Sequence, residues 1–353
     1  MTTEKYVGLD VHKATIVAAV QDGSGKCLMT SVIETKAETI RAFIKGLTGA
    51  VHVTFEEGTH ATWLFDLIKP LVAEVVVCNP RHNALLQSGN KSDKIDANKL
   101  ADLLRTGMVK PVYHDAHGAQ SLKQLAQCYE TLVSDNIRVM NRIKALYRGR
   151  GIDCSGNGVY CESQRKDWVA KLEEPGARSR AQLLYSQLES VKKLRRQARN
   201  EMIKESRRQA ASKLLRAVPG LGPVRVGLIL ATVVTPFRFR TKRQLWTYVG
   251  LAVVTKTSAE YEFVGGQLRK RNKPTSTRGL NRNHNRRLKK VFKSAALDAI
   301  RTEPFASYYR NLIEKGTSPE IARVNIARKL AAIVLSLWKR GEEYDRQRMK
   351  KSA

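Results

Sequence analysis

The sequence predicts an α/β domain followed by a mainly α-helical remainder. Over residues 1–110, short apolar segments alternate with helical patterns, which is typical of a mixed sheet covered by helices. From residue 120 the apolar side chains adopt a sustained helical period. The charge changes at the same place: residues 1–110 hold 13 basic and 12 acidic side chains out of 63 and 32, which leaves 50 and 20 for the remainder. We therefore expect a nearly neutral α/β unit joined to a strongly basic helical one.

The composition indicates a globular protein with a polyanionic partner. The 353 residues are 42% hydrophobic and 27% charged, enough for buried cores in about two or three units. A net charge of +31 favours nucleic acid or an anionic membrane as partner. We expect no membrane partner, because no apolar run approaches the roughly 18 residues that span a bilayer and the N-terminus has no signal-peptide pattern. Five cysteines without CxxC spacing predict a reducing cytoplasm and no structural zinc.

In the N-terminal unit, three consecutive strands precede an alternation of helix and strand. This order indicates a mixed sheet. The expected strands are Tyr6–Val11, Thr15–Val20, Leu28–Ile33, Val51–Phe55 and Val75–Cys78, and the expected helices are Ala37–Gly46, Ala61–Val72 and Ile95–Arg105.

A coiled-coil pattern occupies Gln120–Arg148. Apolar side chains recur alternately three and four residues apart, with Asn136 at an a position, where a buried Asn can fix register and partner number. A second, weaker seam runs from Leu184 to Met202. The two seams form either an antiparallel hairpin within the chain or a dimer interface. The intervening stretch Gly149–Arg178 has no assignable pattern.

The third segment starts near Ala211 and is expected to be helical, ending in a helix over Pro319–Arg340. Between two apolar helices, LLRAVPGLGPVRVGLILATVV places Gly220 and Gly222 in a turn like that of a helix-hairpin-helix. Such glycines let backbone N–H groups approach a phosphate, although a tight turn without a ligand is the alternative. We divide the chain into residues 1–112, 113–210 and 211–345, with a tail at 346–353.

A basic run follows in the same segment. Between Glu262 and Asp298 there is no acidic residue. Such a run is often a solvated face, but its internal position next to an apolar helical segment favours contact with phosphates. The side chains expected to bind nucleic acid are Arg269, Lys270, Arg271, Lys273, Arg278, Arg282, Arg286, Arg287, Lys289, Lys290 and Lys293.

Four carboxylates of the N-terminal unit fall at informative places. Asp10 lies within an apolar strand, Glu56 ends another, and Asp93 and Asp96 are three apart at the start of a helix. If they converge on one edge of the sheet, they require cations, and hard oxygen ligands suit Mg²⁺ or Mn²⁺. For an Asp in a helix N-terminal turn, capping is the alternative role. Glu57 and Asp102 are interpreted as flanking surface charges.

The segments GLDVHK, FEEGT and KSDKIDANKLADLL, in this order, resemble the DEDD motif of the RuvC-like, RNase H-fold transposases of the insertion-sequence one-ten family. The resemblance implies that Asp10, Glu56, Asp93 and Asp96 are the catalytic, metal-binding set. It continues in AVPGLGPVRVGLILATV and FRTKRQLWTYVGL, which are similar to the second, transposase domain of that family. There a Gly-Leu element precedes a nucleophilic serine, which implies Ser258 here, with Thr255 and Thr257 as neighbouring hydroxyls. Val253 and Ala259 depart from the proline and glycine that are usual in the family.

The resemblance also implies an activity and its partners. The protein would be a DNA transposase or recombinase of a mobile element, cutting and rejoining DNA through a 5′-phosphoserine link beside a Mg²⁺ or Mn²⁺ site. Its partners would be donor and target DNA, a structured guide (bridge) RNA and further copies of itself in a homodimer or homotetramer, in a bacterial cytoplasm at the nucleoid. Two alternatives stay open: a metal-dependent nuclease or junction resolvase without a covalent intermediate, and a non-catalytic nucleic-acid-binding protein.

Overall fold

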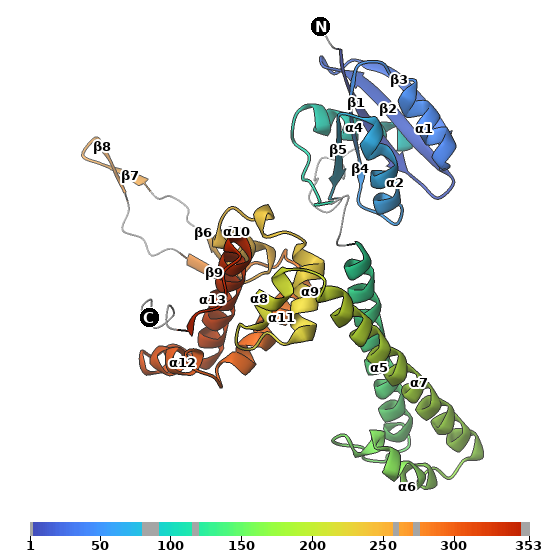
Figure 1. The fold of residues 1–353 in the computed structure, drawn as a ribbon, viewed down its shortest axis with the longest axis vertical. Coiled ribbons are helices and arrows are strands. Elements are labelled where there is room, and N and C mark those ends of the chain that lie inside the picture. Colours follow the sequence, from blue (N-terminus) through green and yellow to red (C-terminus); the bar gives the residue numbers. More distant parts are fainter. Residues whose placement is uncertain (1–2, 80–91, 115–119, 257–260, 271–275, 347–353) are drawn as a thin grey trace. The chain divides into compact units, whose positions relative to one another are not determined.

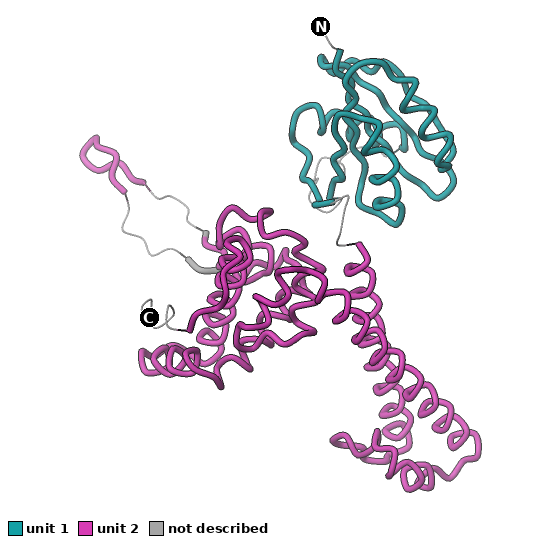
Figure 2. The backbone as a smooth tube through the Cα atoms, in the orientation of Figure 1, with its two compact units in different colours: residues 1–117 teal, residues 118–353 magenta. Residues whose placement is uncertain are grey.

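The computed structural model describes residues 3–79, 92–114, 120–256, 261–270 and 276–346 (Figure 1). The chain forms two compact units, residues 1–117 and 118–353 (Figure 2). The first unit is a mixed α/β sheet and the second is mainly helical, as the sequence predicts. The finer division of the second unit at residue 210 stays a prediction.

The first unit is built on a five-stranded sheet. Strands β1 (Glu4–Val11), β2 (Thr15–Asp22), β3 (Cys27–Glu34), β4 (Ala50–Glu56) and β5 (Glu74–Cys78) lie in the order β3-β2-β1-β4-β5. The β1–β2 and β2–β3 pairs are antiparallel, whereas β1–β4 and β4–β5 are parallel. All five expected strands are confirmed. This mixed order is consistent with an RNase H/RuvC-like domain.

Helices cover both faces of this sheet. On one face, α1 (Ala37–Lys45) and α2 (Ala61–Ile68) pack their buried side chains against those of β1, β2, β4 and β5. On the other face, Ala97 of α4 (Asp93–Arg105) packs against Val17 and Ala19 of β2. Helix α2 ends earlier than expected, and its last turn is a 3₁₀ helix, Lys69–Leu71. Pro70 has no N–H group to continue the α-helical hydrogen bonds.

The predicted seams form a hairpin within the chain. Helices α5 (Gln120–Arg148) and α7 (Pro175–Ser206) run side by side (Figure 1), so the intramolecular alternative describes this structure. The unassigned stretch between them forms 3₁₀ turns at Gly158–Tyr160 and Glu162–Gln164 and the short helix α6 (Arg165–Ala170). Buried Tyr147 and Tyr185, with hydroxyls 3.1 Å apart, join the two helices near this tip.

The remaining helices form a single core with the base of the hairpin. They are α8 (Ala211–Arg216), α9 (Pro223–Val233), the 3₁₀ turn Pro236–Arg238, α10 (Lys242–Tyr248), α11 (Arg286–Ala299), α12 (Phe305–Glu314) and α13 (Pro319–Arg340). Leu122 and Ala126 of α5 and Met202 of α7 belong to this core. Among the described residues, none of the helices combines the length and the apolar composition that crossing a bilayer requires.

The third segment, expected to be helical, also contains short strands that begin just before the basic run. β6 (Val253–Lys256) pairs with β9 (Ser276–Leu280), and β7 (Tyr261–Val264) pairs with β8 (Gln267–Lys270), both antiparallel. Gly265 and Gly266 connect β7 to β8 with φ angles of 59° and 80°. A two-residue turn with both φ angles positive fits the twist of a hairpin, and glycine adopts it without steric cost.

Candidate functional site

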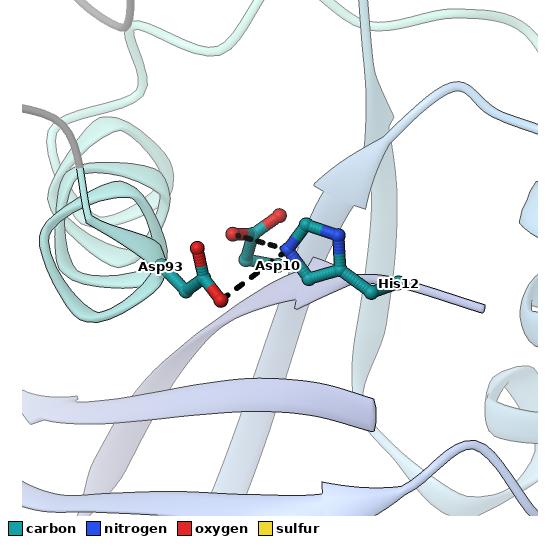
Figure 3. Close-up of side chains that lie close together, drawn as sticks. All are labelled: Asp10, His12 and Asp93. Carbon is teal, nitrogen blue, oxygen red and sulfur yellow. Dashed lines mark hydrogen bonds and ion pairs between the residues drawn. The ribbon is translucent and has the colours of Figure 1, made fainter. Parts of the chain in front are cut away.

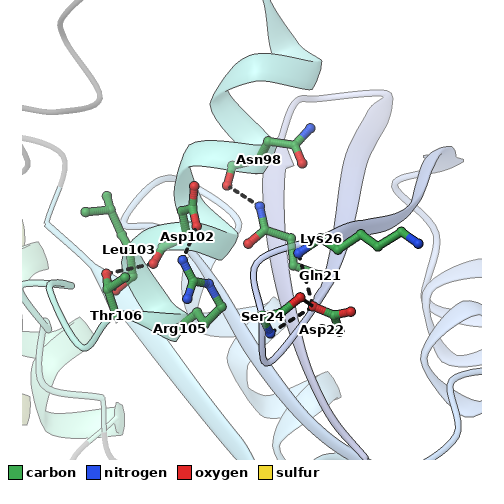
Figure 4. A network of polar contacts seen from close by, with 9 residues as sticks. All are labelled: Gln21, Asp22, Ser24, Lys26, Asn98, Asp102, Leu103, Arg105 and Thr106. Carbon is green, nitrogen blue, oxygen red and sulfur yellow. Dashed lines mark hydrogen bonds and ion pairs between the residues drawn. The ribbon is translucent and has the colours of Figure 1, made fainter.

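The position of helix α4 depends on a glycine in the central strand. A Cβ atom at Gly8 would lie 2.1 Å from the carbonyl oxygen of Ala97 and 2.5 Å from the backbone nitrogen of Ala101. Only glycine therefore lets α4 lie directly on β1. Buried Gln21 of β2 holds the same helix, since its Nε2 donates to the carbonyl oxygen of Asn98 at 3.3 Å (Figure 4). The first turn of α4 is thus held beside the end of β1.

Two aspartates and a histidine meet at this place. His12 Nε2 lies 3.2 Å from Asp10 Oδ2 and 3.6 Å from Asp93 Oδ2 (Figure 3). The possible ligand atoms of the three residues all lie within 4.8 Å of one another. His12 was missed by the sequence reasoning, although it stands two residues after Asp10 in GLDVHK, where an extended chain points both side chains the same way.

Glu56 ends the strand next to Asp10. Leu9 of β1 pairs with Phe55 of β4 in parallel register, so the next residue of each strand is a carboxylate at the same edge. Burial, followed by the charges of Asp10 and Asp96, raises the pKa of Glu56. Glu56 is not part of the group that lies within 4.8 Å. It lies close enough for these charges to act on it.

The charge of Asp10 is also unfavourable in the absence of a cation. Burial raises the pKa of Asp10 most, and the charges of Asp93 and Asp96 raise it further. The hydrogen bond and the charge of His12 oppose that shift. The carboxylates of this edge therefore repel one another, and a divalent cation would relieve that repulsion.

Ser92, and not an aspartate, caps helix α4. Its side chain accepts a hydrogen bond from the backbone N–H of Ile95 at 3.3 Å. Asp96 Oδ1 is buried and has no hydrogen-bond partner among the described residues, and the nearest recorded cation, Lys99 Nζ, is 3.9 Å away. A buried carboxylate oxygen without a donor fits a site that takes a metal ion. Neither Asp93 nor Asp96 is therefore the N-cap residue of α4.

The two carboxylates interpreted as flanking charges have other partners. Glu57 pairs with His114 Nε2, and Asp102 lies 2.8 Å from Arg105 Nη2 within α4 (Figure 4). Glu57 thus differs from Glu56: Glu57 pairs with His114, whereas the charges of Asp10 and Asp96 act on Glu56 and raise its pKa.

The predicted nucleophile Ser258 lies outside the described residues, as does Thr257. The preceding segment is anchored to the helical core: Arg328 Nε donates to the carbonyl oxygen of Leu251 at 2.6 Å. Gly250 has a φ of 72°, and a Cβ atom there would lie 2.4 Å from His284 Cγ. Thr255 is opposite Thr277 in the β6–β9 pair. The base of this strand pair is therefore fixed by close packing and by Arg328.

The basic side chains differ in their availability. Arg269 and Lys270 in β8 are exposed, as are Arg282, Arg286 and Lys290. Lys289 is half-buried, and burial, together with the charge of Lys293, lowers its pKa. Arg271, Lys273 and the side chain of Arg278 lie outside the described residues.

Arg287 has partners within the chain. It forms an ion pair with Glu130 of α5 and donates to Gln127 Oε1 at 2.8 Å. Because its guanidinium group already links α11 to α5, these contacts favour a structural role over the predicted contact with phosphate.

The glycine turn between α8 and α9 is fixed by packing. Gly220 has a φ of 79°, and a Cβ atom there would lie 2.4 Å from the carbonyl oxygen of Ala295 in α11. Arg225 Nη1 donates to the carbonyl oxygen of Gly220 at 2.7 Å and pairs with Asp298. Gly222 is the N-cap residue of α9. The positive φ angle and the close packing explain why residue 220 is a glycine even if no ligand binds there, as the tight-turn alternative states.

Comparisons with known proteins match two successive parts of the chain. A family model described as a transposase, of the DEDD type of IS110, matches residues 7–149, which contain the four carboxylates. A second, described as the transposase IS116/IS110/IS902 family, matches residues 212–310, which contain Ser258 and the basic run. Over 111 residues the chain is 32% identical to the transposase for insertion sequence element IS1533 of Leptospira borgpetersenii. This match covers 30% of the chain and 32% of that relative, about a third of its length.

Proposed function

Because the chain belongs to the IS110 family of transposases, we propose that it cuts DNA at the ends of a mobile element and rejoins it elsewhere. The observation that carries this proposal is the acidic edge of the sheet in the first unit, where Asp10 and Asp93 offer oxygens within 4.8 Å of each other and Glu56 ends the neighbouring strand. Such an edge is suited to phosphoryl transfer on a polyanionic substrate. The strongly basic second unit supports DNA as that substrate.

The proposed nucleophile is Ser258. Its Oγ attacks the scissile phosphorus and forms a serine–phosphate ester, while the bond from phosphorus to the 3′ oxygen breaks. The leaving 3′ oxygen ends as a hydroxyl, having gained the proton that the serine lost. Attack by another DNA 3′-hydroxyl reverses the exchange and restores the serine, so rejoining needs no high-energy cofactor. The described segment that precedes Ser258, Gly250 to Thr255, is anchored to the helical core.

The proposed cofactor is Mg²⁺, with Mn²⁺ as the substitute. The donor set fits a hard divalent cation, since Asp10 and Asp93 offer oxygens close together and Asp96 has a buried oxygen without a donor. When bound, the ion would supply Lewis-acid polarisation of the scissile phosphate. His12 bonds to Asp10 and thereby orients the carboxylate that faces Asp93.

The finer features of the proposal rest on the family resemblance. They are guidance by a structured bridge RNA, assembly into a homodimer or homotetramer, and action at the bacterial nucleoid. The carboxylates and Ser258 belong to different compact units. The reaction therefore requires a unit of each kind, from one or from two protomers, to meet on the same DNA.

The test is a strand-exchange assay on donor and target DNA with the guide RNA and Mg²⁺. Asp10→Asn, Glu56→Gln, Asp93→Asn and Asp96→Asn should each abolish the joined product, because each removes an anionic ligand. Glu57→Gln and Asp102→Asn, whose carboxylates pair with His114 and Arg105, serve as controls and should retain it. Recombination at the wild-type level by two or more of the four variants would contradict the metal assignment.

A further inference from the structure

Helices α10 and α12 both pack against α13 in the helical unit (Figure 1). Residues of these three helices, and of the segments that follow α10 and α13, line a cavity of about 1020 Å³, and its lining includes neither Gly220 nor Gly222. Cationic side chains from two of the helices line it: Lys242, Arg243, Arg328, Lys329 and Arg340. A hollow with this lining attracts anions.

Aromatic rings alternate with these cations. Lys329 Nζ lies 4.1 Å from the centre of the Tyr308 ring, and Lys242 Nζ lies 5.7 Å from that of Trp246. Trp246 Nε1 donates to the carbonyl oxygen of Arg328 at 2.9 Å, which fixes the indole at the cavity wall. Burial lowers the pKa of Lys329 because it disfavours the charged ammonium group, and a bound anion would offset that cost. Fixed rings beside lysines are the combination that binds unpaired bases together with their phosphates.

The acidic residues described in the lining come from one short segment. Glu342, Glu343 and Asp345 follow α13 directly, and among the residues that the structure describes the lining contains no other Asp or Glu. Gly341, with a φ of 67°, ends the helix and reverses the chain. Tyr344 then packs against the helical core. The Glu342 carboxylate lies 3.9 Å from Arg340 of the lining, and the Glu343 carboxylate lies 3.9 Å from Lys213, which lies outside the lining. Three acidic residues thus line a cavity that also carries cations, in a chain of net charge +31.

We propose that this cavity binds a single-stranded nucleic-acid segment, with a backbone phosphate at Lys242 and Lys329 and a base against Trp246. The acidic segment Glu342–Asp345 lines the same cavity, with the Glu342 carboxylate at Arg340, and competes with that strand for the cavity. A single strand is required because the bases of a duplex have no free face to offer the rings. The inference rests on the proposed function for its substrate class, and adds to it a site and an intramolecular competitor.

The experiment compares two full-length variants with the same charge change. One neutralises the segment (Glu342→Gln, Glu343→Gln, Asp345→Asn), and the matched control neutralises exposed carboxylates elsewhere in the second unit (Glu162→Gln, Glu173→Gln, Glu314→Gln). Fluorescence anisotropy measures binding to labelled dT12, rU12 and a 12-base-pair duplex. We expect the segment variant to bind a single strand about 10-fold more tightly than the control does, since three nearby repulsions are removed. Affinity for the duplex should change equally in both variants.

A second background tests the site itself. In Lys242→Gln/Lys329→Gln, neutralising the segment should improve single-strand binding less than about 2-fold, because the strand has lost its phosphate contacts in the cavity and no longer binds beside the segment. Equal affinities of the segment variant and its control for both dT12 and rU12 would overturn the proposal, as would a 10-fold gain that persists in the double-lysine background. A gain restricted to dT12 or to rU12 supports it and shows that the site distinguishes these two strands. Single-strand binding at the cavity involves neither Ser258 nor the carboxylates of the first unit. A negative result here therefore leaves the strand-exchange proposal standing, and a negative strand-exchange result leaves the cavity proposal standing.

Discussion

Replacing Asp10 by Asn should stabilise the protein in the absence of divalent cations. Asp10 and Asp93 offer oxygens no more than 4.8 Å apart, and burial and neighbouring carboxylates raise the pKa of Asp10. A carboxyl group whose pKa is higher in the folded state favours folding when protonated and loses that advantage as the pH rises through the folded pKa. At pH 7 and above, the charged Asp10 therefore destabilises the fold, and Asn removes this cost.

The size of the effect follows from the separation of the charges. Two unit charges 4.8 Å apart repel by about 0.9 kcal/mol at the dielectric constant of water, and by more in a less polar medium. Because the Asp93 side chain is 61% exposed, we use the value for water and expect a gain of about 1 kcal/mol. The Asn carbonyl oxygen can still accept the hydrogen bond from His12, so the variant loses little else.

The assay is thermal denaturation at pH 7.5 and low ionic strength, in EDTA and in Mg²⁺. Asp10→Asn should melt roughly 4 °C above wild type in EDTA, whereas Mg²⁺ should stabilise the wild type and leave the variant unchanged. Asp66→Asn, which alters an exposed carboxylate of α2, controls for the change in net charge. A variant that melts below both wild type and Asp66→Asn in EDTA would refute the repulsion, and a wild type that does not respond to Mg²⁺ would refute the cation site.

Three further predictions test the packing and the basic surface. Gly8→Ala should destabilise the first unit by about 3 kcal/mol in urea denaturation, because its methyl group would overlap the Ala97 carbonyl; Gly23→Ala, which has nothing within 4 Å, should change it by less than about 0.5 kcal/mol. Arg282→Gln/Arg286→Gln should lower the slope of log affinity against log salt by about two units for DNA, and an unchanged slope would mean that these exposed side chains contact no phosphate. Arg287→Gln should instead lower the melting temperature and leave that slope unchanged, since its partners are Glu130 and Gln127.

The sequence was sufficient for most of the sheet and the long helices because their signals are local. Short apolar segments marked β1 to β5, and the three-four spacing marked α5. The strands β6 to β9 were missed since they are only four or five residues long, and VVTK and YEFV lie before or at the start of the basic run. Their pairing depends on distant partners, such as Val253 with Leu280.

The candidate site was predictable in residue type but not in geometry. The positions of Asp10, Glu56, Asp93 and Asp96 relative to strand and helix ends indicated an acidic edge. The role of Gly8 became visible only in the backbone approach to Ala97, and Arg287 differs from its exposed neighbour Arg286 only through Glu130, far away in the sequence. Such contacts depend on the tertiary fold, which no local pattern encodes.

The most direct test of the account is whether Ser258 becomes covalently linked to DNA. Labelled donor DNA is incubated with the protein, the guide RNA and Mg²⁺, denatured, and run on a gel with and without protease digestion. The account predicts a shifted, protease-sensitive band for the wild type and for Thr255→Ala, and its loss in Ser258→Ala and in Asp10→Asn. A band that persists in Ser258→Ala would contradict the assignment of the nucleophile, and Mg²⁺-dependent cutting without any such band in the wild type would contradict the phosphoserine mechanism in favour of a metal-dependent nuclease.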